Sequence, residues 1–246
     1  MKSTFLIAAL LGAAMASYGQ SSMSDNEFKP QAKALSTELN FNPFNGQLNL
    51  NNSLNQIKFR YFVKPQLALR LGFNVNKKDT VVNYNNPYGS NSYFFKDDRK
   101  STTFGLNFGI EKHFNGTKRL SPYIGADVSF SNRSANQTID NNGSTTTVKG
   151  AWYNTTVINN NTVINQVQQN GYKRYGVNLV SGFDFYMASH FFFGYEFNLG
   201  FYKVDWKKID VTQTGQANNT GNTTNENSSL NFGSTLMNGI RIGYNF

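Results

Sequence analysis

The residues of this chain that could do chemistry are mostly charged side chains, set singly or in pairs into apolar stretches. The 246 residues include 23 Lys and Arg, 14 Asp and Glu, two His and no Cys. Nine of the charges share the polar face of segments in which every second residue is apolar, so we expect five acids and four bases to form ion pairs. These nine are Glu38, Lys58, Arg60, Arg70, Glu111, Asp127, Asp184, Glu196 and Arg241.

Neither histidine is placed as a catalytic base should be. Hydrolytic chemistry on a lipid needs an imidazole beside the nucleophile, on the side where the substrate lies. His113 and His190 both fall at expected short connections between strands, where polar side chains are commonly exposed. We therefore expect two polar turn residues, with His113 near the lower rim of the interior, and no enzyme. The chain also offers no cluster of His and carboxylates, so we expect no metal and no cofactor.

Composition excludes several classes of protein. The absence of cysteine excludes a disulfide scaffold, a thiolate metal site and a lipid-anchored N-terminal cysteine. The formal charge of +9 would suit nucleic acid, but neither a basic stripe nor a recognition helix accompanies it, so no nucleic-acid partner is expected. A mean hydropathy of −0.49 and the lack of a long apolar run exclude a spanning helix. If the chain enters a membrane, it must do so as a β-barrel.

The first 19 residues have the pattern of a secretory signal peptide. Lys2 precedes an uncharged run over 5–16, and small residues at Ser17 and Gly19 occupy the −3 and −1 positions of a cleavage site. We expect cleavage after Gly19, with cleavage after Ala16 as the alternative.

The rest of the chain alternates with a period of two, which is typical of β-strands. Between Leu67 and Val75 every second residue is apolar, and Arg70 lies on the opposite face. Apolar parity slips between Leu54 and Ile57, which predicts a β-bulge near 55–56. We expect eight strands, over about 34–43, 55–63, 66–76, 102–113, 121–131, 174–187, 191–204 and 231–246.

The connections between these strands alternate in length, which predicts an up-and-down meander with mobile loops at one end. The short joins are 64–65, 114–119 and 188–190, and the long polar joins are 44–54, 77–101, 132–173 and 205–230. Asn45-Gly46 is a type I′ turn signal, so the first long join is a candidate tight turn. Within the third, 145–163 alternates Thr, Val and Ile with Asn. It is either a β-ribbon whose edge could add a partner strand or a low-complexity tip.

Composition decides which face of the strands points outward. The polar face is rich in Gly and Asn and has about one charge per strand, whereas a solvated face would be dense in Lys and Glu. The apolar face is large on every strand, and exposed to water it would far exceed the few hundred Å² that a soluble protein tolerates. We predict an all-β, eight-stranded antiparallel up-and-down transmembrane β-barrel. A soluble secreted ligand-binding barrel is the alternative.

Three stretches resemble the small outer-membrane β-barrel family of the OmpA/OmpX transmembrane type, and the likeness covers about 33–246. They are Ser121 to Ala126, Gly182 to Phe185 with Gly194 to Glu196, and Gly243 to Phe246. The resemblance implies a bacterial outer-membrane location, with 1–19 as signal peptide, 20–32 as N-terminal periplasmic tail and 33–246 as barrel. Tyr244 and Phe246 look like the C-terminal signal that such proteins present to the barrel-assembly machinery. The likeness ends at Phe246, so we expect no peptidoglycan-binding domain of the kind that larger relatives carry, and the resemblance does not imply wall anchoring.

In such a barrel the nine charges lie in the lumen. An eight-stranded barrel is only just wide enough inside for its own side chains, so we expect a salt-bridged plug. A narrow porin-like channel for small solutes, in which the pairs exchange, is the alternative.

The long loops are where we expect function, as a structural or surface-interaction role with a possible surface partner. Cations outnumber acids on that side, which predicts contact with phosphates of outer-membrane lipid and lipopolysaccharide. The alternative is that these cations only anchor strand ends. They are Lys77, Lys78, Lys96, Arg99, Lys100, Arg133, Lys149, Lys173, Arg174, Lys203, Lys207 and Lys208.

Overall fold

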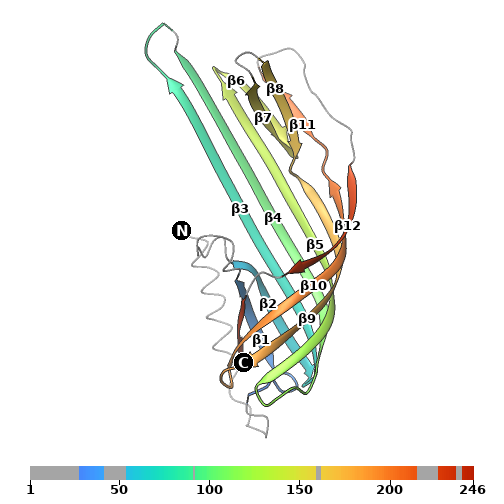
Figure 1. The fold of residues 1–246 in the computed structure, drawn as a ribbon. Coiled ribbons are helices and arrows are strands. Elements are labelled where there is room, and N and C mark those ends of the chain that lie inside the picture. Colours follow the sequence, from blue (N-terminus) through green and yellow to red (C-terminus); the bar gives the residue numbers. More distant parts are fainter. Residues whose placement is uncertain (1–27, 42–53, 91, 159–161, 215–226, 237–239) are drawn as a thin grey trace.

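The computed structural model describes residues 28–41, 54–90, 92–158, 162–214, 227–236 and 240–246 (Figure 1). The expected signal peptide, most of the expected periplasmic tail and the Asn45-Gly46 turn lie outside the described residues. No helix among the described residues is long and apolar enough to cross a membrane.

The barrel is a closed ring of eight antiparallel strands, which confirms the predicted eight-stranded barrel. Because one of the eight is interrupted, each of the eight positions in the ring is called a wall here. Each wall pairs with the next along the chain, and the last pairs with the first through Ser36 opposite Asn245. The eighth wall consists of two strands, β12 and β13, both paired with β10. The walls are β1 Leu35–Phe41, β2 Leu54–Lys64, β3 Leu67–Asn86, β4 Tyr93–His113, β5 Leu120–Asn141, β9 Tyr172–Tyr186, β10 Phe191–Trp206, β12 Ser228–Leu236 and β13 Ile240–Asn245.

The register between β1 and β2 contains the predicted bulge. Asn40 lies opposite Gln56, and the next residue, Phe41, lies opposite Leu54, so Asn55 is the extra residue on β2. Such a β-bulge places two residues of one strand opposite one residue of its partner and shifts the period-two pattern by one residue. The parity slip in the sequence was therefore a reliable signal.

Apolar side chains point out of the barrel and polar side chains point into it. On β4, Phe108 is 53% exposed, while the inward Glu111 is 1% exposed. On β10, the outward Phe197 and Leu199 are exposed and the inward Glu196 is fully buried. The band of outward apolar residues surrounds the lower part of the long strands, as hydrocarbon contact requires.

Three walls continue far beyond this band. β3, β4 and β5 have 20, 21 and 22 residues, about twice what a tilted strand needs to cross a bilayer. Their upper halves form an open sheet that β6 Ser144–Lys149 and β11 Asp210–Gln213 extend (Figure 1).

The prediction of loops over 77–101 and 132–173 is therefore wrong for most of both stretches. The polar sequence suggested loops, but Thr, Val and Tyr favour strands, and each strand continues the hydrogen-bond ladder of its neighbour, as from Lys77 opposite Thr102 to Asn86 opposite Tyr93.

The alternating stretch 145–163 does form strands, but not a single free ribbon. β6 pairs with β5 on one side and with β11 on the other, so its edge is covered. β7 Ala151–Ile158 and β8 Thr162–Gln169 form a separate two-stranded sheet. This hairpin packs on the extension through a small core of Val148, Ala151 and Ile209.

Candidate functional site

All nine sequence-predicted charges lie in the lower lumen, and all are buried. Alternation along each strand turns them inward, and the closed ring brings strands from opposite walls within reach of one another. None is more than 5% exposed, and Arg60, Asp184, Glu196 and Arg241 are fully buried. Such burial requires that each charge be paired.

Glu196 and Glu111 occupy one side of this charge network. The Glu196 carboxylate accepts Arg70 Nη2 at 2.7 Å, Lys58 Nζ at 3.1 Å and the Tyr123 hydroxyl at 2.6 Å. The Glu111 carboxylate accepts Arg60 Nη1 at 3.0 Å and Arg70 Nη1 at 3.4 Å. Arg70 thus bridges two acids that lie on different walls.

Glu38 and Asp184 occupy the other side. Arg241 donates Nη1 to Glu38 at 3.0 Å and Nη2 to Asp184 at 2.6 Å. Arg60 Nη1 donates to Asp184 at 2.6 Å. Lys58 Nζ lies 3.0 Å from the Glu38 carboxylate. The two arginines therefore hold Asp184 between them.

Asp127 is the least tightly paired of the nine. Its carboxylate accepts a hydrogen bond from Asn178 Nδ2 at 2.7 Å, and Arg70 Nη2 lies 3.7 Å away. Together the contacts form one continuous network in which every carboxylate faces at least one base.

A floor of aromatic rings lies against the network, and the pattern of charges in the sequence does not predict it. The Arg60 guanidinium stands 4.7 Å from the ring centre of Phe192 and 5.8 Å from that of Phe62, and Arg241 stands 5.1 Å from that of Tyr123. Cation–π contact adds to the stabilisation of a desolvated guanidinium. The signal was present in the parity: Phe62 and Phe192 are even-numbered on strands whose outward residues are odd-numbered.

Glycines let the lumen close around these groups. A Cβ on Gly182 would lie 2.7 Å from the Tyr123 hydroxyl, and one on Gly194 would lie 2.8 Å from Arg241 Nη2. A Cβ on Gly243 would meet the Phe192 ring. The inward glycines therefore serve close packing of large side chains across the lumen.

His113 lies near the lower rim of the interior, as expected, but the expectation of an exposed turn residue is wrong for it. His113 is the last residue of β4, is 3% exposed and lies inside the lower rim. Its Nε2 lies 3.0 Å from Glu111 and its Nδ1 lies 2.9 Å from the Ser121 hydroxyl. Only the odd, inward parity of β4 indicates this position. His190 is an exposed residue of the β9–β10 turn, with Nδ1 2.8 Å from the Asn245 carbonyl oxygen.

The two aromatic residues of the expected assembly signal lie where the barrel closes. Phe246 donates its backbone N–H to the Leu35 carbonyl at 2.8 Å, which ties the chain end to β1. The Tyr244 ring contacts Phe246 and Phe191 with centroid distances of 5.0 Å each.

Several cations on the long-loop side of the barrel, here called the outer rim, are paired with an acid on their own strand. Lys77 pairs with Asp79, and Lys203 pairs with Asp205. Lys207 Nζ donates to the Ser134 hydroxyl at 3.2 Å. Burial, and then the nearby charge of Lys173, lower the pKa of Lys207.

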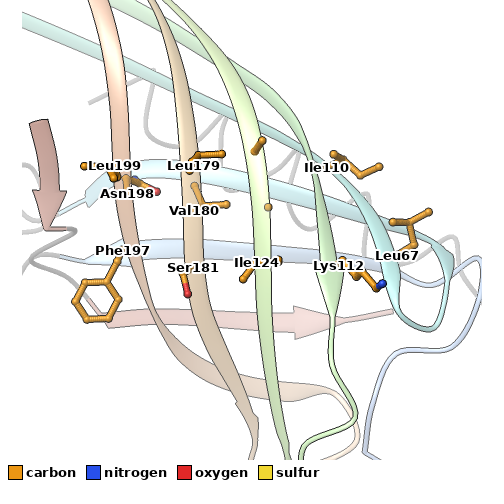
Figure 2. Close-up of a pocket in the computed structure, with 12 residues that line it drawn as sticks. Leu67, Ile110, Lys112, Ile124, Leu179, Val180, Ser181, Phe197, Asn198 and Leu199 are labelled. Carbon is orange, nitrogen blue, oxygen red and sulfur yellow. The ribbon is translucent and has the colours of Figure 1, made fainter. Parts of the chain in front are cut away.

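An apolar groove of about 750 Å³ crosses the exterior wall (Figure 2). Ser181 lies between the larger Ile124 and Phe197, which are its direct cross-strand neighbours. Lys112 is the only charged side chain in the lining, and it lies at one end of the groove beside Leu67. Among the described residues, no three His, Asp or Glu side chains are grouped as a metal ion would need.

Comparison with known proteins supplies a family. A family model of OmpA-OmpF-like porins matches residues 41–246. The N-terminal β-barrel domain of Pseudomonas aeruginosa OprF is similar at 13% identity and a TM-score of 0.34, over 88% of this chain and 100% of that one. Acinetobacter baumannii CarO is similar at 13% identity and a TM-score of 0.27, over 89% of this chain and 99% of that one. No curated protein matches the chain.

Proposed function

The chain belongs to the OmpA-OmpF-like porin family, and on that premise we propose that it is a bacterial outer-membrane barrel with a closed lumen. In this proposal the charge network and the aromatic floor form a plug. The protein then acts through its outer surface, as a structural or surface-interaction protein, and does not catalyse a reaction.

The single observation that carries the plug is the burial of the network, in which no charged residue is more than 5% exposed. Arg60 and Arg241 reach inward from β2 and β13 and share Asp184 on β9. Phe62 and Phe192 are also fully buried beneath them. In this proposal, side chains packed so closely that they exclude water block an aqueous path through their layer.

Planar-bilayer recording tests the plug. Purified, refolded protein is inserted into a bilayer, and its insertion is checked by heat-modifiable migration of the same vesicles on gels. We expect current at the level of leak at moderate voltage. Stable unitary currents from the folded form would contradict the plug.

The family itself favours a second candidate, a narrow channel for small solutes. The observation in its favour is that carboxylates share bases: Glu38 lies within ion-pair distance of Lys58, Arg60 and Arg241. Such pairs could exchange partners and open a path. The channel requires unitary currents that Glu38→Gln alters, so the same recording separates the two candidates.

The outer rim is proposed to contact phosphates of lipopolysaccharide. Support comes from outward lysines next to the apolar band: Lys173 lies two residues from Tyr175, and Lys203 two residues from Phe201. Anionic headgroups attract such cations. The variant Lys173→Gln should reduce the lipopolysaccharide that co-purifies, measured by mass spectrometry, and Lys112→Gln near the other end of the barrel is the control. Equal retention in both variants would contradict the contact.

The location and the lack of catalysis are parts of the same proposal. Both imidazoles are engaged, His113 with Glu111 and Ser121 and His190 with a backbone carbonyl. Fractionation of the producing bacterium should recover the mature protein, without residues 1–19, in carbonate-resistant outer membranes. Recovery as a soluble secreted protein would contradict the proposal.

A further inference from the structure

A cleft of about 970 Å³ lies on the extension above the barrel, outside the lumen network. Its floor continues the inward face of the sheet through Thr80, Val82 and Tyr84 on β3 and alternate residues of the next strands. Gln213 of β11 lies on the same sheet beside Thr146, and Tyr153 of the β7–β8 hairpin faces the cleft from outside this sheet. Figure 1 shows these elements gathered at the end of the molecule opposite the short turns.

Polar and charged side chains beside the cleft join the β7–β8 hairpin to the sheet. Gln137 is fully buried; its Nε2 donates to Asp97 at 2.9 Å and to the Tyr153 carbonyl oxygen at 3.1 Å. Arg99 donates Nε to Asp97 at 2.9 Å and Nη1 to Asn154 at 2.9 Å. These bonds dock the hairpin against the sheet, so the two charges of the lining satisfy each other.

The rest of the lining is aromatic, aliphatic or neutral and polar. Tyr84 and Phe95 lie directly opposite one another on β3 and β4, with ring centres 6.1 Å apart. Tyr84 is 58% exposed, although it lies in a cleft. The neutral polar groups are the hydroxyls of Thr80, Ser144 and Thr146 and the amides of Asn141 and Gln213.

This lining matches one class of ligand. Aromatic rings pack against the C–H faces of sugar rings, while hydroxyl and amide groups can each donate to and accept from sugar hydroxyls. A charged ligand would need an unpaired opposite charge, and the lining offers only the Asp97–Arg99 pair. Ser144 and Gln213 already contact each other, but an apolar ligand would offer no hydrogen bond to the hydroxyls of Thr80 and Thr146 or to the amide of Asn141 in the lining.

We propose that the cleft between the extended β3–β6 sheet and the β7–β8 hairpin binds an uncharged oligosaccharide. Tyr84 and Phe95 form the stacking platform, and the hydroxyls and amides around them orient the sugar. The site is separate from the plug, so it does not depend on whether the lumen conducts ions.

An oligosaccharide array with the full-length protein in detergent tests this. One arm carries uncharged oligosaccharides released from the producing bacterium's own surface, a second carries plant and animal glucans, mannans and N-acetylhexosamine oligomers, and a third carries sulphated and sialylated glycans. Binding in either uncharged arm supports the site, and the arm identifies the source. Binding confined to the anionic arm, or to none, overturns the proposal.

Titration calorimetry with the best uncharged oligosaccharide then locates the site. Tyr84→Ala and Phe95→Ala should each weaken binding by about tenfold or more, while affinity should be unchanged between low and high salt. Tyr88→Ala is the matched control, because this tyrosine is 85% exposed in the connection between β3 and β4, beyond Tyr84 and Phe95, and is not in the lining. Heat-modifiable migration of each variant verifies folding. Equal affinity of Tyr84→Ala and Tyr88→Ala, or loss of binding in salt, overturns the proposal.

Discussion

The pairing of Arg241 with Glu38 offers the sharpest energetic test of the lumen network. Arg241 Nη1 lies 3.2 and 3.0 Å from the two Glu38 oxygens, and both side chains are nearly inaccessible. In Arg241→Met, Glu38 retains Lys58 while Asp184 retains Arg60. Removing one member of a buried pair costs about 3–5 kcal/mol, since the partner charge stays buried.

The double variant should be less destabilised than the sum of its parts. Each single variant changes the net charge of the network by one unit, whereas adding Glu38→Gln to Arg241→Met removes one acid and one base together and leaves the net charge as it was. Groups within one network typically couple by about 0.5–3 kcal/mol, and we expect a value in the upper half of that range. The measurement is the free energy of unfolding in urea from lipid vesicles, followed by tryptophan fluorescence and by heat-modifiable migration.

An exposed pair on the same barrel is the matched control. Lys77 and Asp79 lie 3.1 Å apart on β3, but their side chains are 66% and 40% exposed. Exposed pairs contribute about 0–1 kcal/mol, so the Lys77–Asp79 cycle should show little coupling. A coupling of Arg241 with Glu38 no larger than that of the control would refute the network.

Three further variants probe the packing around the network. Phe192→Ala should destabilise the barrel by about 3–5 kcal/mol through the cavity it leaves, measured by the same urea titration. Gly182→Ala should destabilise the barrel by about 1–3 kcal/mol, the usual cost of overpacking, or lower the refolding yield. Gly233→Ala is its control, because nothing lies near a Cβ at that position, and it should refold normally. Equal refolding yields of the two variants would contradict the crowding at Gly182. Tyr123→Phe removes a 2.6 Å hydrogen bond to Glu196 and should cost about 1.5–3 kcal/mol; an unchanged midpoint would show that this bond does not stabilise the fold.

The sequence predicts most of the barrel because strand geometry is simple. A period of two assigns each residue to a face, and a closed eight-stranded ring gives every inward charge a place near the axis. The same argument located the Asn55 bulge. The same parity places Phe62 and Phe192 inside, because both share the inward face of the charges on their strands, although apolar residues at such positions carry no charge pattern that marks them.

Partner choice within the lumen could not be predicted from the pattern. Arg60 lies directly opposite Arg70 in register, yet its shortest ion pair is to Asp184 on β9. Such contacts depend on strand tilt and on the reach of long side chains across the lumen. The extension was missed for a different reason: its pairing comes from backbone ladders between polar strands, as at Thr80 opposite Arg99, which carry little hydrophobic signal.

The orientation of the two strand faces is the central claim, and brominated lipids test it most directly. The chain has no cysteine, so single-cysteine variants at Leu106, Asn107, Phe197 and Asn198 each carry one fluorescent label. We expect brominated acyl chains to quench the labels at 106 and 197 strongly and the labels at 107 and 198 weakly. Equal quenching within each neighbouring pair, or stronger quenching at 107 and 198, would contradict a barrel with its apolar face in lipid and its charges inside.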